Sequence, residues 1–260
     1  MGFRTRSEAT MADQSHQQAR EDLAAAFRVA AAMTLNEGIC NHFSLTIPGD
    51  DERYLINPYG VHWSEMRPDH LLLIDGNGQV MEGEGEVEAT ARFIHVAAHR
   101  ANPRHACVLH THMPHATALT MLEGGKLEMA HQTACRFHDR IFYVEEFGGL
   151  ALDEEEGEAI ASSAKADLHA DIFFLKHHGV TVCGPSVAEA FDDLYYLERA
   201  ARQQVLAEAT GRPLKIMTDQ QVEHTARQMR QTMAVSAQEH FVALKRLHPT
   251  PATVAPVAQS

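Results

Sequence analysis

The stretch Ala106-Cys107-Val108-Leu109-His110-Thr111-His112-Met113-Pro114-His115 decides how this chain folds. Its first half is apolar, which is typical of a short strand buried on both faces of a sheet. Pro114 has no backbone N–H and suits the first position of a helix, so we expect the strand to end there and a helix to run to Leu122. Because side chains alternate along a strand, His110 and His112 point to the same side and could share one metal ion.

Composition bounds the class of protein. The chain has 260 residues, of which 45% are hydrophobic and 22% charged, and this is typical of one globular, soluble domain. It shows neither an apolar run long enough for a membrane span nor a signal peptide. Its four cysteines form no C-x-x-C pair, which favours a cytoplasmic protein with reduced thiols. The net charge of −13 argues against nucleic acid or an anionic membrane as partner, but it permits a small-molecule substrate, which could be a carboxylate.

Periodicity predicts an irregular alternation of strands and helices. Apolar and alternating runs predict strands at residues 42–49, 53–60, 71–75, 140–144, 171–176 and 180–183. Helical spacing and cap residues predict helices at 21–35, 90–100, 114–122, 153–164, 186–208 and 219–247. We therefore expect an α/β fold, a mixed sheet with helices on both faces. We expect a disordered leader at 1–18, a domain at 19–215 with a helical extension at 216–248, and a disordered tail at 249–260.

A third metal ligand is expected at the end of another buried strand. His178 follows the predicted strand at 171–176 and precedes Gly179, which would let the backbone turn closely beside a metal. His177 is the alternative, because its side chain should face the opposite way. Three imidazoles would leave an open coordination position for substrate or water.

Five motifs in sequence order carry a resemblance to a known family. They are Asn41-His42-Phe43-Ser44, Ile56-Asn57-Pro58-Tyr59-Gly60, Val108-Leu109-His110-Thr111-His112-Met113-Pro114, His177-His178-Gly179-Val180 and Ala190-Phe191-Asp192-Asp193-Leu194-Tyr195-Tyr196-Leu197-Glu198-Arg199. The chain resembles the class II aldolase/adducin N-terminal (head) domain family over residues 22–213, and in particular its adducin-like, bacterial-type branch.

That resemblance implies a class II aldolase-like fold, three α/β/α layers around a mixed, largely antiparallel sheet. It implies a homo-oligomer, often a tetramer, with active sites between subunits. It also implies one divalent metal per chain, zinc in the sugar-phosphate aldolases, held by His110, His112 and His178. Three histidines are equally compatible with Mn²⁺ or Fe²⁺.

The chain also departs from the family. Where the aldolases carry a glutamate that serves as metal ligand and general acid/base, this chain has Ala91. Glu88, one helical turn upstream, is the expected substitute, although an acid that only stabilises the start of a helix is an equally good interpretation. His138 is a second candidate for proton transfer. The aldolases bind phosphate with a Gly-Asn pair, and Asn41-His42 in its place argues against a phosphorylated sugar.

Four further residues are expected to bind substrate. Asn41, Ser44 and Asn57 would line the pocket by their position in the motifs. Arg136 could hold a substrate carboxylate with two parallel hydrogen bonds.

The sequence thus predicts a metal-dependent carbon–carbon lyase, either an aldolase or a decarboxylase. It would act on a small hydroxy or keto carbonyl compound through a metal-stabilised enediolate. One alternative is a non-catalytic, adducin-like interaction module, although adducin heads have lost the metal-binding histidines. Another is an iron-dependent oxygenase on the same fold.

Overall fold

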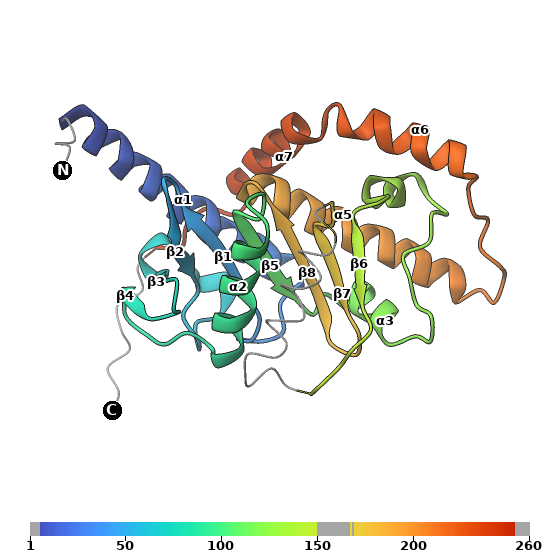
Figure 1. Ribbon diagram of the computed structural model, residues 1–260, viewed down its shortest axis with the longest axis horizontal. Coiled ribbons are helices and arrows are strands. Elements are labelled where there is room, and N and C mark those ends of the chain that lie inside the picture. Colours follow the sequence, from blue (N-terminus) through green and yellow to red (C-terminus); the bar gives the residue numbers. More distant parts are fainter. Residues whose placement is uncertain (1–5, 150–166, 168, 253–260) are drawn as a thin grey trace.

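Within the described residues, eight strands form one mixed sheet with the order β4-β3-β2-β1-β5-β8-β7-β6 (Figure 1). The computed structural model describes residues 6–149, 167 and 169–252. Every neighbouring pair is antiparallel except β6 and β7, so the prediction of a mixed, largely antiparallel sheet is confirmed. The strands are β1 His42–Ile47, β2 Asp50–Ile56, β3 Leu72–Asp75, β4 Val80–Glu82, β5 Cys107–Thr111, β6 Ile141–Val144, β7 Ile172–Leu175 and β8 Gly179–Gly184.

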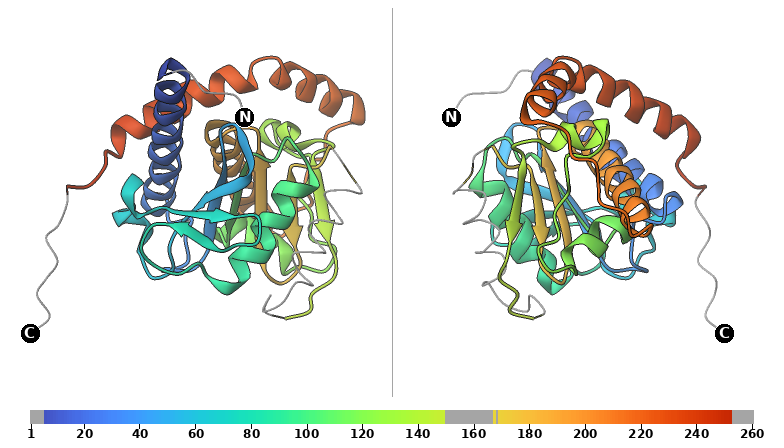
Figure 2. Two further views of the ribbon diagram at one scale, coloured as in Figure 1. Left: turned by 60° about the vertical axis from the view of Figure 1, so that its left-hand side comes forward. Right: turned by 90° about the vertical axis from the view of Figure 1, so that its right-hand side faces the viewer.

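Helices cover both faces of this sheet, which confirms the three-layer architecture (Figures 1 and 2). The α-helices are α1 Arg6–Ala32, α2 Ala89–Ala101, α3 Pro114–Thr120, α5 Val187–Glu208, α6 Asp219–Arg230 and α7 Met233–Leu247. The described part of the chain also contains the short 3₁₀ helices η1 Trp63–Glu65, η2 Pro68–His70 and η3 Gln132–Phe137. Within the described residues, no helix combines the length and the apolar character that crossing a bilayer requires.

Alternation along the central strands separates two cores. Phe43 of β1 and Leu109 of β5 belong to the large apolar core beneath α1, α3 and α5. Val108 of β5 points the other way, into a smaller cluster that includes Ala98 of α2. His110 lies two residues after Val108, so it faces the α2 side of the sheet.

The N-terminal prediction is wrong for residues 6–18, which are helical and not a disordered leader. Helix α1 begins at Arg6, although we expected the helix to start at residue 21. The buried side chains of Leu23 and Phe27 anchor the later turns against the sheet. Once those turns are formed, adding further turns of good helix formers has no nucleation cost.

The C-terminal segment forms two helices where we predicted one. Helix α6 ends at Arg230 and α7 starts at Met233. The break lets α6 bury Val222 and Ala226 while α7 buries Phe241 and Leu244 on a different part of the molecule. No glycine or proline marks it in the sequence. The helix predicted at 153–164 and the tail beyond residue 252 lie outside the described residues.

Candidate metal centre

Three histidines meet where β5 and β7 end. Both strands run antiparallel to β8, so their C-terminal ends lie at the same end of the sheet. His110 lies within β5, His112 directly follows it, and His178 precedes β8. One ligand nitrogen of each ring lies within 4.8 Å of the other two, which is the arrangement that a single metal ion requires.

His178, and not His177, takes the third position. The His178 ring centroid lies 4.8 Å from those of both His110 and His112. His177 adopts a left-handed backbone conformation with φ of 57°, and its ring packs against Phe147 at 5.7 Å. The alternative that the sequence left open is therefore resolved by the turn between β7 and β8.

Gly179 lets the backbone of β8 approach β5 closely. A Cβ atom at this position would lie 2.7 Å from Cδ2 of His112 and 2.8 Å from the carbonyl oxygen of Thr111. Both separations are shorter than real Cβ contacts, so only glycine fits without a shift of the strand or of the ring. The glycine thus belongs to the construction of the metal centre.

The other ring nitrogens of two of these histidines have partners of their own. Nδ1 of His112 contacts the Glu37 carboxylate, and Nδ1 of His110 lies 3.3 Å from the Thr181 hydroxyl oxygen. Such contacts fix the orientation of an imidazole and leave Nε2 for a metal. Burial lowers the pKa of His110 well below its ordinary value, which keeps the imidazole neutral as a metal ligand must be. This all-nitrogen donor set fits a divalent metal.

Glu37 is a functional candidate that the sequence analysis missed. It follows α1 in the loop before β1, and its side chain is exposed. The loop is shaped by Asn41, which has a left-handed φ of 75°. The Asn41 side-chain oxygen accepts hydrogen bonds from the backbone N–H of Glu37 at 3.1 Å and of His112 at 3.4 Å. Only the Asn41 motif could have drawn attention to this loop.

Asn41 and Asn57 are both buried beside the centre and hold its backbone. The Asn57 side chain accepts from the Phe43 N–H and donates to the Asn41 carbonyl, each at 3.3 Å. Ser44 is fully buried, and its hydroxyl lies between two histidines of α2, His95 and His99. The expectation that Ser44 lines the pocket is therefore wrong, whereas direct substrate contact by either asparagine remains a prediction.

Glu88 lies close to the loop that carries Glu37. It is the N-cap residue of α2, where it makes no side-chain capping hydrogen bond. The pKa of the Cys40 thiol is raised by burial and then by the negative charges of Glu88 and Glu37, so both carboxylates are near this cysteine. Glu88 keeps its candidacy as acid/base, and Ala91 is buried on the next turn of the helix.

Arg136 and His138 lie at the opposite end of the sheet from His110, His112 and His178. Both precede β6, which is parallel to β7, so they are near the start of these strands and not near their ends. The His138 carbonyl accepts a hydrogen bond from Arg230 at 2.9 Å. Within this chain, the structure therefore does not bring His138 to the metal centre as expected.

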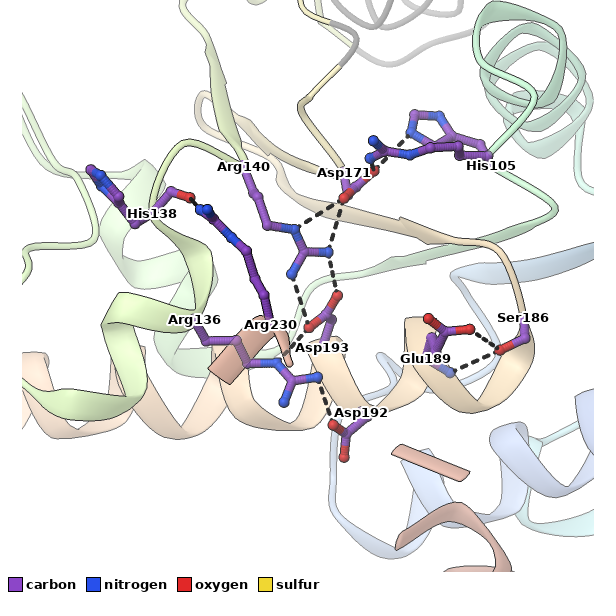
Figure 3. A network of polar contacts seen from close by, with 11 residues as sticks. His105, Arg136, His138, Arg140, Asp171, Ser186, Glu189, Asp192, Asp193 and Arg230 are labelled. Atoms are coloured by element: carbon purple, nitrogen blue, oxygen red, sulfur yellow. Dashed lines mark hydrogen bonds and ion pairs between the residues drawn. The ribbon is translucent and has the colours of Figure 1, made fainter. Parts of the chain in front are cut away.

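The expected substrate contact of Arg136 is also corrected. Its Nε donates to Asp193 and its Nη2 to Asp192, each at 2.6 Å, and the residue is buried (Figure 3). Arg140 shares Asp193 and also binds Asp171. The guanidinium of Arg136 thus neutralises buried carboxylates of α5, which would otherwise be costly to desolvate.

Comparison with known proteins shows the family of this chain. The chain matches the family described as Class II Aldolase and Adducin N-terminal domain over residues 21–205. It belongs to that family, which confirms the resemblance carried by the five motifs.

Three relatives show how far the similarity extends. A protein of Pseudomonas aeruginosa with the name "Putative aldolase class 2 protein" is 33% identical over 199 residues, which are 76% of this chain and 74% of that protein. Decarboxylase NovR of Streptomyces niveus is 29% identical over 181 residues, 69% of this chain and 66% of NovR. The crystal structure of an aldolase II superfamily protein from Pseudomonas syringae is 29% identical and covers 90% of this chain and 93% of its own, with a TM-score of 0.82.

Proposed function

We propose that this protein is a metal-dependent carbon–carbon lyase of the aldolase or decarboxylase type, acting on a small hydroxy or keto carbonyl compound. The observation that carries the proposal is the convergence of His110, His112 and His178 at the end of the sheet. A scaffold module has no need of three imidazoles whose ligand atoms meet. The similarity to a decarboxylase adds support for the reaction class.

The histidines and two glutamates of this chain would have different roles in the proposed reaction. His110, His112 and His178 would hold the cation, and the Glu37 carboxylate would orient the His112 ring. When bound, a divalent metal would polarise a carbonyl and stabilise the negative charge that develops as a carbon–carbon bond breaks. Glu88 would deliver or remove the proton at the carbon atom where that bond is cleaved.

We propose zinc as the metal, because neutral imidazoles suit it and the family contains zinc enzymes. We also propose a cytoplasmic homotetramer. The described cysteines are all free thiols, as in a reducing compartment. Met121 and Leu122 after α3 and Leu206 on α5 are exposed, and apolar side chains of this size favour burial between subunits.

Elemental analysis by inductively coupled plasma mass spectrometry tests the proposal, with a His110→Ala/His112→Ala variant as control. About one zinc per chain, lost in the variant, is expected, together with lyase turnover in a screen of hydroxy and keto acids. Iron in place of zinc would direct the screen to oxygenation. Absence of any metal, even after reconstitution, would overturn the proposal in favour of an adducin-like interaction module.

A further inference from the structure

A layer of buried polar side chains lies between β1 and α2, next to the metal centre. In β1, Phe43 faces the large apolar core, so His42 and Ser44 face the opposite side, toward α2. His95 and His99 are four residues apart on α2 and share one face of that helix. All four polar residues are buried, with at most 7% of each exposed.

These four side chains form one continuous hydrogen-bonded chain. His42 Nδ1 lies 2.6 Å from His95 Nε2, and His95 Nδ1 contacts the Ser44 hydroxyl. The same hydroxyl lies 2.7 Å from His99 Nε2. His99 Nδ1 lies 2.6 Å from the backbone carbonyl oxygen of His105, and the Thr46 hydroxyl oxygen lies 3.3 Å from the same nitrogen.

The final carbonyl sets the direction of every hydrogen bond, because a carbonyl only accepts. Burial lowers the pKa of His99 to about 4 and that of His95 well below its ordinary value, so both rings are neutral near pH 7. His99 must then donate from Nδ1 and accept at Nε2 from Ser44. The Ser44 oxygen in turn accepts from His95 Nδ1, and His95 Nε2 accepts from His42 Nδ1.

The other end of this chain faces the metal centre. His42 pairs with His110 in the register of β1 and β5, and their rings stack with centroids 4.9 Å apart and planes 24° apart. His42 does not belong to the group whose ligand atoms lie within 4.8 Å of one another. Since its Nδ1 donates to His95, a neutral His42 carries a lone pair on Nε2, on the far side of its ring from α2.

We propose that the buried chain from His42 to His99 fixes His42 as the Nδ1–H tautomer, so that its Nε2 is a permanent hydrogen-bond acceptor beside the metal centre. This nitrogen then selects substrates that carry a hydroxyl group next to the reacting carbonyl. A substrate hydroxyl can donate a hydrogen bond to this nitrogen. A substrate with a hydrogen atom in place of the hydroxyl leaves the acceptor without a donor, and one with an anionic oxygen there is repelled by the nitrogen lone pair. His42 is thus a specificity-determining residue, and Ser44, His95 and His99 are positioning residues. The substrate selection rests on the proposed lyase function, but the tautomer does not.

The tautomer can be tested on the metal-free protein by long-range ¹H–¹⁵N NMR of the imidazole nitrogens. We expect the proton of His42 on Nδ1, although free histidine in water favours Nε2–H. Ser44→Ala removes the central hydroxyl and should return His42 to a mixture of tautomers, whereas Ser44→Thr keeps a hydroxyl and should restore the single tautomer. A wild-type His42 that carries its proton on Nε2 would overturn the inference without touching the proposed function.

The selection can be tested with two probes that chelate zinc through the same hydroxamate group, glycolohydroxamate and acetohydroxamate. They differ by one hydroxyl. Zinc-loaded wild type should bind glycolohydroxamate about tenfold more tightly, the size of one hydrogen bond. His42→Asn keeps a donor toward His95 but has no acceptor at the Nε2 position, so the preference should disappear while the affinity for acetohydroxamate stays the same.

Ser44→Ala should reduce the same preference and Ser44→Thr should restore it, which a purely structural role would not produce. A preference that survives in His42→Asn would overturn the assignment of His42. Failure of the wild type to bind zinc or either hydroxamate would overturn the proposed function and the selection with it, and the NMR experiment would still decide the tautomer.

Discussion

Replacing Gly179 with alanine tests whether the metal centre depends on the close approach of β8 to β5. The added methyl group would lie 2.7 Å from Cδ2 of His112 and 2.8 Å from the Thr111 carbonyl oxygen. Ordinary contact begins near 3.4 Å, so the ring and the strand would have to withdraw by about 0.6–0.7 Å. Overpacking of this kind costs about 1–3 kcal/mol.

The cost should appear in metal affinity, because the group that must move is a ligand. One of the two neighbours is backbone in the middle of the sheet, where β5 pairs with both β1 and β8. We therefore expect the His112 ring to yield, which would disturb the grouping of the three ligand nitrogens. We expect zinc affinity to fall about 10- to 100-fold, which corresponds to about 1.4–2.8 kcal/mol.

The assay is a zinc titration in competition with a chromophoric chelator, accompanied by thermal unfolding of the metal-free protein. Gly148→Ala is the matched control, because a Cβ at Gly148 meets no heavy atom within 4 Å and no left-handed φ opposes the substitution. It should leave both measurements unchanged. If Gly179→Ala bound zinc as tightly as wild type and unfolded at the same temperature, the reasoning about close approach would be refuted.

Three further predictions follow from the same contacts. Glu37→Ala should weaken zinc binding about 10- to 100-fold through loss of the carboxylate on His112, and calorimetry should show an unchanged metal-free melting temperature because Glu37 is exposed. Arg136, which the sequence suggested would hold a substrate carboxylate, instead binds Asp192 and Asp193, so Arg136→Lys should lower the free energy of unfolding by about 1–3 kcal/mol in urea titrations, with zinc affinity as the control that stays constant. Burial lowers the pKa of His99 from 6.5 to about 4, so below pH 6.5 the unfolded chain binds a proton that the folded chain rejects. The contribution of His99 to the free energy of unfolding is complete above pH 6.5 and falls by as much as about 3 kcal/mol toward pH 4. In urea unfolding of the metal-free protein, His99→Gln should make this pH dependence less steep. An equally steep dependence in both proteins would contradict the prediction.

The clustering of the three histidines could be predicted because their placement follows from local rules. Alternation along one strand puts His110 and His112 on the same side, and the end of a buried strand followed by glycine singles out His178. Each of these patterns spans only a few residues. The sheet then brings them together through strand directions that the family resemblance already implied.

The remaining site residues depend on contacts that no local pattern reports. Glu37 reaches His112 across 75 positions of sequence, and Arg136 finds its aspartate partners 56 and 57 positions away. The sequence feature that could have predicted the ion pairs of Arg136 is the Asp192-Asp193 pair within an otherwise apolar helix face, because buried carboxylates require a cation. Ser44 belonged to a motif typical of a pocket, but its orientation depends on which face of β1 meets α2.

The two ends of the sheet have complementary tasks. At the end opposite His110, His112 and His178, Asp171 directly precedes β7 and pairs with Arg104, which precedes β5. His110 lies near the other end of β5 and His178 follows the other end of β7, so this ion pair ties together the two strands that position these candidate ligands. The arginine side chains of this network contact carboxylates at the end of the sheet opposite His110, His112 and His178. The candidate metal centre thus has three imidazoles, a carboxylate on one of them and a neighbouring buried chain of histidines. A divalent ion bound there would meet no fixed positive charge from this network.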